Sequence, residues 1–221
     1  MKKEYSVFDI VGPRMIGPSS SHTAGAVRMA HVARHVAHND ISEVKFTLYG
    51  SFAETGKGHG TDKALVAGIL GMEPDDINVR NSFELAREQG ILVDVEFSDE
   101  PSEYPNTAKI EIVGTKGDFT QVTGVSIGGG NILITEINGL GVEVTCEYPT
   151  IVIRHVDAPG VIAQISAVLA EMQVNVANMR VFRHERGQDS YMTVESDTKI
   201  TEEMAKEMQK LCPSILEYRI V

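Results

Sequence analysis

Cysteine is scarce in this sequence: Cys146 and Cys212 are the only two among 221 residues. A four-iron cluster generally needs three or four thiolate ligands, which two widely separated cysteines cannot supply. Cys-x-x-Cys pairs of the kind that bind tetrahedral zinc are absent as well. No disulfide framework is implied, so we expect free thiols in a reducing compartment. Any iron–sulfur centre that this protein uses must therefore be held by another chain.

Long hydrophobic runs are also lacking. The first residues, Met1 to Asp9, contain no uninterrupted apolar stretch of the kind that a signal peptide needs. The longest mostly apolar run, Ala64 to Met72, is too short to span a bilayer. We therefore expect a cytoplasmic protein that does not bind a membrane.

Basic residues are outnumbered, with 20 Lys and Arg against 31 Asp and Glu and a net charge of -11. A chain this acidic repels a phosphate backbone and has no basic stripe, which argues against nucleic-acid binding. Hydrophobic residues make up 42% of the chain and charged residues 23%, which is enough apolar material for a globular core. The length suits one large or two modest domains.

The chain is predicted to be α+β, and its N-terminal α/β domain is expected at residues 1–147. Met29, Val32, Ala33 and Val36 follow the helical period and form the apolar stripe of a helix from 22 to 38. Turn residues separate the segments that follow. We expect a strand at 44–49, then a glycine-rich turn, helices at 61–70 and 81–90, and strands at 91–97, 107–113, 121–127 and 131–137.

A second domain with the order β-α-β-β-α-β is predicted for residues 150–221. Its first helix carries an apolar face that includes Val161, Ile165 and Leu169. Thr201 is the expected N-cap of the second helix. This order of elements is the ferredoxin-like split β-α-β arrangement. The four strands are expected at 151–156, 174–182, 189–195 and 216–221.

The segment Asp157-Ala158-Pro159-Gly160-Val161, with the helix and the Val174-Asn175-Val176 strand that follow, resembles the ACT family. Gly160 allows a tight turn into a helix whose free N–H groups can receive a carboxylate, and Asp157 can accept hydrogen bonds from an ammonium. In the alternative interpretation, Asp157 only caps the helix and the domain only mediates dimerisation. In that family, effectors lie between two ACT domains. The resemblance therefore implies a homodimer that binds L-serine or a related amino acid through His155, Asp157, Gly160 and Asn175.

The stretch Ser19-Ser20-Ser21-His22-Thr23-Ala24-Gly25 puts four hydroxyls and one imidazole at the start of the first helix. With the free N–H groups of the helix, these side chains can form a corner that binds a carboxylate. Serine and threonine are also common N-caps, so capping alone is an alternative explanation. No Gly-x-Ser-x-Gly elbow is present, and a serine-hydrolase triad is not indicated.

The stretch Gly56-Lys57-Gly58-His59-Gly60-Thr61-Asp62 is the second candidate site. It is no P-loop, because Gly58 follows Lys57 where a Ser or Thr is required. Three glycines leave His59 uncrowded and allow a ligand to approach the backbone, while Thr61 and Asp62 begin the next helix. A solvent-exposed loop with an incidental histidine is the alternative.

Together, Gly-Pro-Ser-Ser-Ser-His-Thr-Ala-Gly and Thr-Gly-Lys-Gly-His-Gly-Thr-Asp resemble the beta region of iron–sulfur L-serine dehydratases, in which an ACT domain follows. The resemblance covers essentially the whole chain. It implies a subunit that converts L-serine to pyruvate and ammonia together with an alpha subunit that carries a [4Fe–4S] cluster. It also implies that His59 acts as acid or base. The residues expected to hold L-serine are Ser20, Ser21, His22, Thr23, Lys57 and Asp62.

Other interpretations remain open at this stage. His31, His35 and His38 have a spacing that can hold a divalent metal, although a solvated polar face explains them better. A pyridoxal-phosphate enzyme could use Lys57 and the glycines at 128–130, but a tight turn between strands accounts for these glycines. In a third interpretation, the first domain resembles the allosteric substrate-binding domain of some phosphoglycerate dehydrogenases, and the subunit is purely regulatory.

We expect the purified chain to hold no stable four-iron cluster and to show no serine dehydratase activity, because Cys146 and Cys212 are its only thiols. Mixing with an anaerobically prepared alpha chain should restore pyruvate formation. Robust turnover by this chain alone would contradict the division of catalysis between two subunits.

Overall fold

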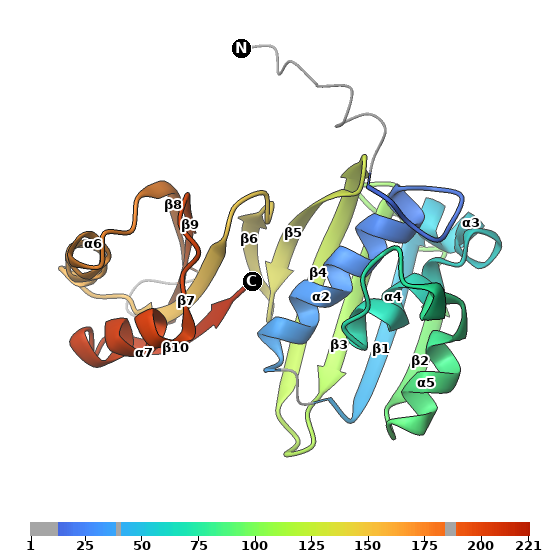
Figure 1. Cartoon of the computed structure of the whole chain (residues 1–221), viewed down its shortest axis with the longest axis horizontal. Helices are drawn as coiled ribbons and strands as arrows, with labels where there is room; N and C mark the ends of the chain where they lie inside the picture. The colour runs from blue at the N-terminus through green and yellow to red at the C-terminus, as the bar shows by residue number, and fades with distance from the viewer. Residues whose placement is uncertain (1–12, 39–40, 184–188) are drawn as a thin grey trace, which may run out of the picture. The chain divides into compact units, whose positions relative to one another are not determined.

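The computed structural model describes residues 13–38, 41–183 and 189–221 (Figure 1). The chain separates into two compact units, residues 1–139 and 140–221. Both units combine helices with sheets, as the α+β prediction required. None of the described helices has the length and hydrophobicity needed to cross a membrane.

A six-stranded sheet with the order β2-β1-β3-β4-β5-β6 forms the framework of the first domain, and only its last strand, β6, follows residue 139. Strand β1 is parallel to β2 and antiparallel to β3, and the β3–β4 and β4–β5 pairs are antiparallel. The strands are β1 (Glu43–Gly50), β2 (Leu92–Phe97), β3 (Asn106–Val113), β4 (Phe119–Gly128), β5 (Asn131–Ile137) and β6 (Leu140–Val144). Strand β6, a short strand in which Gly141 interrupts the apolar residues, was not predicted.

Helices cover one face of this sheet (Figure 1). Alternate residues of the strands point into the interface with the helices, so Phe46, Ile110 and Ile134 have no exposed surface. Met29 and Leu65 fill the same core from the helices. The helical elements are η1 (Ser21–Gly25), α2 (Ala26–Val36), α3 (Ser51–His59), α4 (Thr61–Ile69), η2 (Ile77–Asn81) and α5 (Ser82–Glu88).

One edge of the sheet gathers several chain turns. Gly50 at the end of β1 pairs with Asn106 at the start of β3, and Gly128 at the end of β4 pairs with Asn131 at the start of β5. Because these strands alternate in direction, all four strand ends lie at the same end of the sheet, along the line of the strand termini. We call this end of the sheet the site edge. Helix α3 begins directly after β1, and η1 contacts β4 and β5.

The expected glycine-rich turn after β1 is wrong, because residues 51–59 form helix α3. Phe52 and Gly56, one helical turn apart, are both buried. A Cβ at Gly56 would lie 3.4 Å from Thr61 and 3.5 Å from the Phe97 ring, in ordinary contact. Packing therefore offsets the low helix propensity of glycine. Gly60 then ends the helix in the left-handed conformation, with φ of 72°, and α4 begins at Thr61 as predicted.

The first helix also differs from its prediction. It begins with a π-helical turn, in which the Gly25 N–H donates to the Ser20 carbonyl at 2.9 Å, and continues as α2. The glycines at 128–130 connect β4 and β5 as the turn interpretation predicted, and all three have positive φ values of 63° to 102°. Glycine adopts this conformation without strain.

The second unit contains the predicted ferredoxin-like arrangement as an antiparallel sheet with the order β10-β7-β9-β8. Its helices share an apolar core with one face of the sheet, and Thr201 caps the second helix by accepting from the Met204 N–H at 3.3 Å. The elements are β7 (Thr150–Val156), α6 (Val161–Glu171), β8 (Val176–Arg183), β9 (Asp189–Ser196), α7 (Glu202–Leu211) and β10 (Ile215–Ile220).

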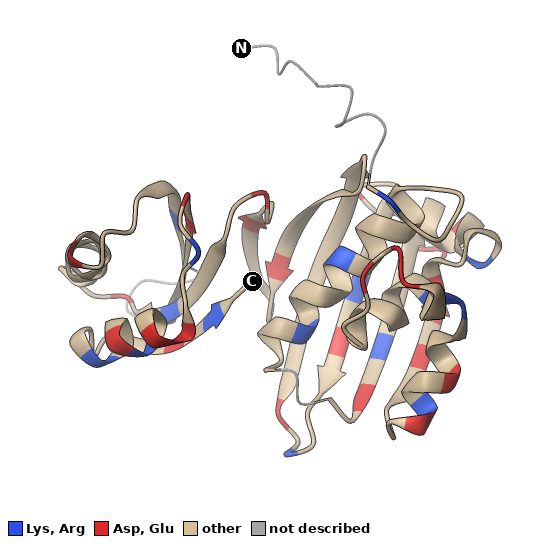
Figure 2. Cartoon of the chain, viewed as in Figure 1, with Lys and Arg blue, Asp and Glu red and all other residues tan. Residues whose placement is uncertain are grey.

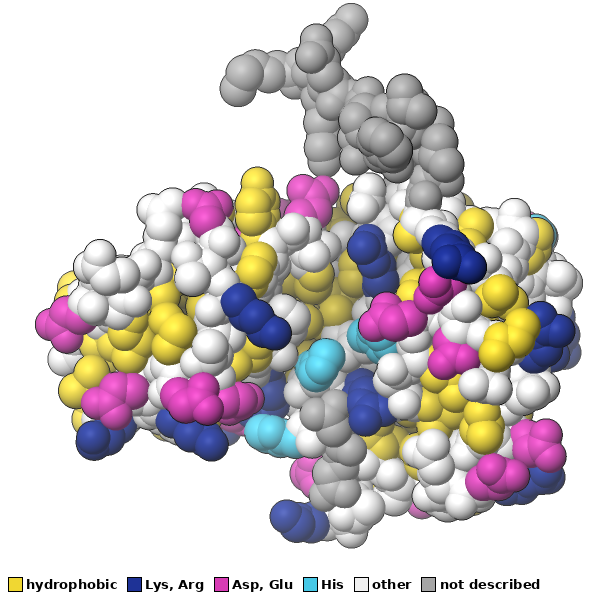
Figure 3. Space-filling model, in the orientation of Figure 1, with side chains coloured by type: hydrophobic (Ala, Val, Ile, Leu, Met, Phe, Trp, Pro, Cys, Tyr) yellow, Lys and Arg dark blue, Asp and Glu magenta, His cyan; other side chains and the backbone are white. Residues whose placement is uncertain are grey.

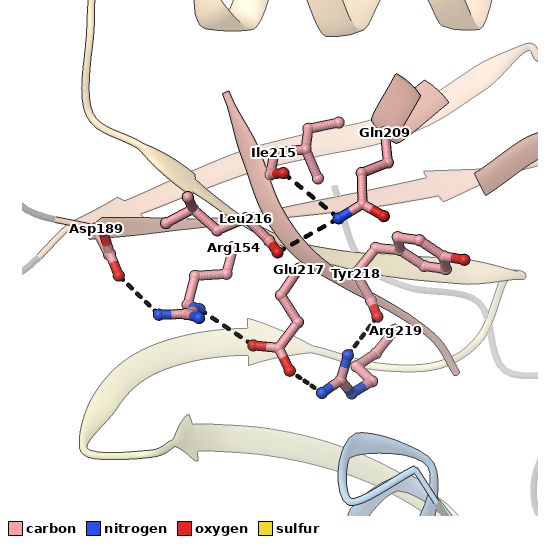
Figure 4. A network of polar contacts seen from close by, with 8 residues as sticks. All are labelled: Arg154, Asp189, Gln209, Ile215, Leu216, Glu217, Tyr218 and Arg219. Atoms are coloured by element: carbon pink, nitrogen blue, oxygen red, sulfur yellow. Dashed lines mark hydrogen bonds and ion pairs between the residues drawn. The ribbon is translucent and has the colours of Figure 1, made fainter. Parts of the chain in front are cut away.

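A polar network connects the edge strand β10 to its neighbours (Figure 4). Arg154 on β7 donates to Asp189 on β9 at 2.8 Å and to Glu217 on β10 at 3.1 Å. Arg219 contacts Glu217 from the other side, and the Gln209 amide donates to two backbone carbonyl groups of β10. Single exposed ion pairs contribute little, whereas a connected set orients the strand more firmly.

Two helical glycines give a matched test of the packing. A Cβ at Gly68 would lie 2.4 Å from the Val27 carbonyl oxygen, so Gly68→Ala must push α4 away from α2. We expect it to lower the free energy of unfolding by about 1–3 kcal/mol, as overpacked core substitutions do. At Gly58, a Cβ meets no described heavy atom within 4 Å. Gly58→Ala should therefore raise stability by about 0.5–1 kcal/mol, because alanine loses less chain entropy. Urea unfolding of both variants measures the contrast, and equal effects would contradict it.

Candidate functional site

The two histidines singled out from separate motifs meet at the site edge. The ring centroids of His22 on η1 and His59 on α3 are 4.6 Å apart, and the ring planes are tilted by 33°. Phe52 lies on another side of His22, with 5.0 Å between the ring centroids in an edge-on arrangement. The structure thus brings together two imidazoles that are 37 positions apart in the sequence.

His22 is 7% exposed and has a polar partner at each ring nitrogen. Its Nδ1 lies 3.3 Å from the Ser19 hydroxyl, and its Nε2 lies 3.0 Å from the Thr55 hydroxyl and 3.4 Å from the Ser51 carbonyl oxygen. Burial lowers the pKa of His22, and the nearby His59 lowers it further, although the bond to Ser51 acts in the opposite direction. A neutral His22 ring is therefore favoured in the folded chain.

His59 is half-buried at the end of α3. Its Nδ1 lies 3.0 Å from the Thr55 carbonyl oxygen, which can only accept a hydrogen bond. In the neutral ring, Nδ1 therefore carries the proton and Nε2 has the lone pair. A ring held in this way can take a proton from a substrate at Nε2.

The other residues predicted near the N-terminal motif take different positions. Ser20 and Ser21 are half-buried, and Ser20, which precedes the helix, makes no side-chain cap hydrogen bond. Ser19 instead accepts from the His22 N–H, at 3.4 Å, so part of the capping interpretation is correct. Thr23 is 1% exposed, and its hydroxyl has no hydrogen-bond partner among the described residues. A buried hydroxyl without a partner is unusual and is available to a ligand or a water.

Lys57 and Asp62 make no recorded contact with either histidine in the described part of the chain. The Lys57 ammonium lies 4.8 Å from the centroid of the Phe97 ring, a cation–π contact. The Asp62 carboxylate accepts from the Lys63 N–H at 2.9 Å. Both side chains still belong to the two helices that meet at Gly60.

Several polar residues of the site edge were not predicted. Thr55 and Ser51 contact His22, and they lie on a helix that was predicted as a turn. Ser126 and Asn106 each have a buried oxygen without a partner among the described residues. The Asn106 amide donates to the Ser126 carbonyl at 3.4 Å. Their positions at strand ends beside Gly50 and Gly128 were the only signal in the sequence, and strand pairing alone brings them together.

The candidate ACT ligand residues lie around the β7–α6 turn, except Asn175. Gly160 has a φ of 92°, which confirms the predicted tight turn into α6. The Asp157 carboxylate lies 3.5 Å from the Arg183 guanidinium, so a ligand ammonium would share it with a cation. Asn175 is exposed and donates to Asp197.

His155 is 2% exposed, and its Nδ1 bonds the Val156 carbonyl oxygen at 2.8 Å. Its Nε2 is buried without a partner among the described residues, as is the hydroxyl of Ser190. Both residues pair in register across β7 and β9. Two buried polar groups thus stand beside the turn that begins α6, and Ser190 was not among the predicted residues.

The three histidines in and after α2 do not form a metal site. His35 and His38 are exposed and His31 is half-buried. Burial lowers the pKa of His31. The pKa of His35 is lowered by partial desolvation beside the helix and by the Arg34 cation, although its side chain still reaches the solvent. No group of three potential metal ligands occurs among the described residues.

The surface shows where the charges lie. Acidic and basic side chains are interspersed along α5, α7 and the strands of the larger sheet (Figure 2). On the face drawn in Figure 3, both signs of charge alternate with apolar side chains.

A hollow of about 510 Å³ lies at the opposite end of the strands from the site edge with His22 and His59. Its lining contains neither a histidine nor a hydroxyl group, so we assign the chemistry to the site edge; the lining residues are Glu43, Val44, Lys45, Leu92, Val93, Asp94, Glu111, Val113 and Phe119.

Comparison with known proteins gives two family matches. Residues 6–136 match the model of the serine dehydratase beta chain, and residues 150–213 match that of the ACT domain. The "Probable L-serine dehydratase, beta chain" of Bacillus subtilis is 44% identical over 215 residues, which cover 97% of both chains. The "L-serine dehydratase, beta chain" of Peptoniphilus asaccharolyticus is 42% identical over 204 residues, or 91% of both chains.

A different enzyme matches in part. The D-3-phosphoglycerate dehydrogenase of Bacillus subtilis is 31% identical over 163 residues, which cover 72% of this chain but only 30% of that enzyme. The similarity to the two beta chains is higher and extends over nearly their whole length.

The lowered pKa of His22 has a consequence for stability. Because the folded chain favours the neutral ring, the unfolded chain binds more protons below its ordinary pKa of 6.5. The contribution of His22 to the free energy of unfolding is present in full above pH 6.5. It is lost as the pH falls through the pKa of His22 in the folded chain. His31 and His35 act in the same direction. We expect His22→Asn to flatten, without abolishing, the loss of unfolding free energy between pH 7.5 and 5.5. An unchanged slope in urea unfolding would contradict the assignment.

Proposed function

The chain belongs to the serine dehydratase beta chain family and carries an ACT domain, and from this premise we propose that it is one subunit of an L-serine ammonia-lyase. Together with an alpha chain, it converts L-serine to pyruvate and ammonia. The observation that carries the proposal is the pair of imidazoles at the site edge, 4.6 Å apart, in a chain similar to two dehydratase beta chains over nearly its whole length. This similarity favours an enzyme subunit over a purely regulatory one.

The reaction needs a base at the α-carbon of L-serine. Removal of the α-proton and departure of the β-hydroxyl with a proton, as water, give aminoacrylate, which tautomerises to the imine. Hydrolysis of the imine releases ammonia and pyruvate. We assign the base to His59, whose Nε2 lone pair is left available by the bond between Nδ1 and the Thr55 carbonyl. The buried oxygens of Thr23, Asn106 and Ser126, which lack partners in the described residues, are available to bind the substrate at this edge.

The cysteines of this chain cannot serve as the ligands of a four-iron cluster. Cys212 is 1% exposed within the apolar core of the second unit, and Cys146 is the only other thiol. We therefore place the [4Fe–4S] cluster in the alpha chain, where it would supply a Lewis acid that assists the departing hydroxyl. The end of α3 and the start of α4, which meet at Gly60, would then face the alpha chain.

The surface beside His59 suits such an approach. Gly58 and Gly60 flank His59, and a Cβ at either position meets no described atom within 4 Å. Gly60 needs glycine for its backbone, with φ of 72°, but Gly58 lies in a helix and has no such requirement. A second chain that comes close to the backbone at residue 58 would explain a glycine there.

We also propose that the ACT domain binds L-serine or a related amino acid, in a homodimer formed through this domain. The N–H groups at the start of α6 would hold the carboxylate, and Asp157 the ammonium, while Asn175 would contact the ligand from the second chain. The buried Nε2 of His155 supports a polar ligand at this turn.

Replacing His59 tests the catalytic assignment. General acid–base catalysis typically contributes about 10²–10⁴-fold, so His59→Ala should lower kcat of the assembled enzyme at least about 10²-fold. The substrate affinity should be retained, because the ring acts on the α-proton rather than as an anchor. Glu54→Ala, an exposed change on the same helix, is the matched control. Near-normal turnover with altered affinity or cooperativity would instead support a regulatory site.

Calorimetric titration of L-serine into the full chain tests the ACT proposal. Asp157→Asn keeps the side-chain shape but removes the charge, so binding should weaken at least about tenfold, as expected for loss of a charged hydrogen bond. Glu171→Gln, at the exposed far end of α6, should bind like the unaltered chain. Ser126→Ala, which removes a buried hydroxyl proposed to bind the substrate, identifies heat that comes from the site edge. Unchanged binding by Asp157→Asn, or no binding by the unaltered dimer, would overturn this proposal.

A further inference from the structure

One residue contacts both histidines of the site edge. The Thr55 hydroxyl lies 3.0 Å from His22 Nε2, and the Thr55 carbonyl oxygen lies 3.0 Å from His59 Nδ1. Thr55 is in the middle of α3, one helical turn before His59. Its side chain and its backbone thus reach two different rings.

The hydrogen atoms of this network can be assigned from the acceptors. The Thr55 hydroxyl lies 2.8 Å from the Ser51 carbonyl oxygen, which cannot donate, so the single hydroxyl proton is directed to it. Toward His22, the Thr55 oxygen can then only accept. The Ser51 carbonyl oxygen, 3.4 Å from the same Nε2, also can only accept. Nε2 of His22 therefore carries a proton, and its Nδ1 accepts from the Ser19 hydroxyl at 3.3 Å.

His59 has the opposite arrangement. The Thr55 carbonyl requires a proton on His59 Nδ1, and the lone pair is on Nε2. The neutral His22 that burial favours stands beside it and adds no positive charge. When His59 takes up a proton, no second cation opposes it from a distance of 4.6 Å between ring centroids.

We propose that Thr55 is a positioning residue that fixes opposite tautomers on His22 and His59, so that His59 presents an unprotonated Nε2 to the substrate. This inference rests on the proposed function, because it assigns a role in proton transfer. Thr55 acts through the two rings, and its hydroxyl and carbonyl act separately. A side-chain substitution therefore disturbs His22 directly and leaves the carbonyl bond to His59.

Two substitutions separate the hydroxyl from the bulk of the side chain. Thr55→Val keeps the volume and removes the acceptor for His22, while Thr55→Ser keeps the hydroxyl. Glu54→Ala, exposed on the next position of the helix, controls for general effects on α3.

The first experiment records ring nitrogen spectra by NMR on the full chain with ¹⁵N-labelled histidine. We expect His22 protonated at Nε2 and His59 at Nδ1 in the unaltered chain and in Thr55→Ser. In Thr55→Val, His22 should become a mixture of tautomers while His59 stays protonated at Nδ1. An unaltered chain in which both rings have the same tautomer, or a Thr55→Val spectrum with His22 unchanged, overturns the proposal. The unaltered chain and Thr55→Ser decide the question even if Thr55→Val does not fold.

The second experiment measures turnover of the assembled enzyme across pH. The His22 ring packs against His59 at 4.6 Å between centroids, so a His22 ring that changes tautomer disturbs the placement of His59. Misplaced catalytic groups cost up to about 10²-fold, and we expect Thr55→Val to lower kcat by roughly tenfold, with KM kept and the acid limb of the pH profile moved. Thr55→Ser should recover most of the activity. A Thr55→Ser enzyme as slow as Thr55→Val would show that the hydroxyl is not the cause. Because the NMR result does not depend on turnover, a failure of the tautomer assignment is distinguishable from a failure of the proposed function.

Discussion

The hydrogen bond between the Thr55 hydroxyl and His22 Nε2 joins the two parts of the candidate site, since His22 belongs to the π-helical turn and His59 to α3. The bond depends on a buried environment: Phe52 packs against His22, and burial favours the neutral ring. Besides this bond, the contacts of His22 with the Phe52 ring and the longer bond to Ser51 orient His22 relative to the helix that carries His59.

The sheet determines where these elements can meet. The ends of β1 and β4 and the starts of β3 and β5 lie together because neighbouring strands run in opposite directions, and α3 begins where β1 ends. Gly50, with φ of 55°, makes the sharp change from strand to helix, and a Cβ there would lie 2.7 Å from the Pro105 carbonyl oxygen. The fold thus places the helix that carries His59 beside buried hydroxyl and amide groups of the site edge.

The sequence predicted the residues of the site better than their contacts. The motifs around His22 and His59 identified both rings, and the order of elements identified the ferredoxin-like unit. Helix α3 was missed because three glycines in its sequence and at its end argue against a helix, whereas the buried Phe52 and Gly56 stabilise one. Thr55 and Ser51 were not predicted as site residues, because they lie on this helix. Asn106 and Ser126 become neighbours only through the pairing of β3 with β4, which no local pattern reveals.

The proposed function makes the site edge half of an active site, which a cluster on the alpha chain would complete. The most direct measurement is the NMR spectrum of ¹⁵N-labelled histidine rings in the assembled enzyme, recorded with the cluster in a paramagnetic and in a diamagnetic state. We expect the His22 and His59 signals to broaden strongly in the paramagnetic state, because relaxation by an unpaired electron acts over short distances. Signals from both rings that remain equally sharp in the two states would contradict it.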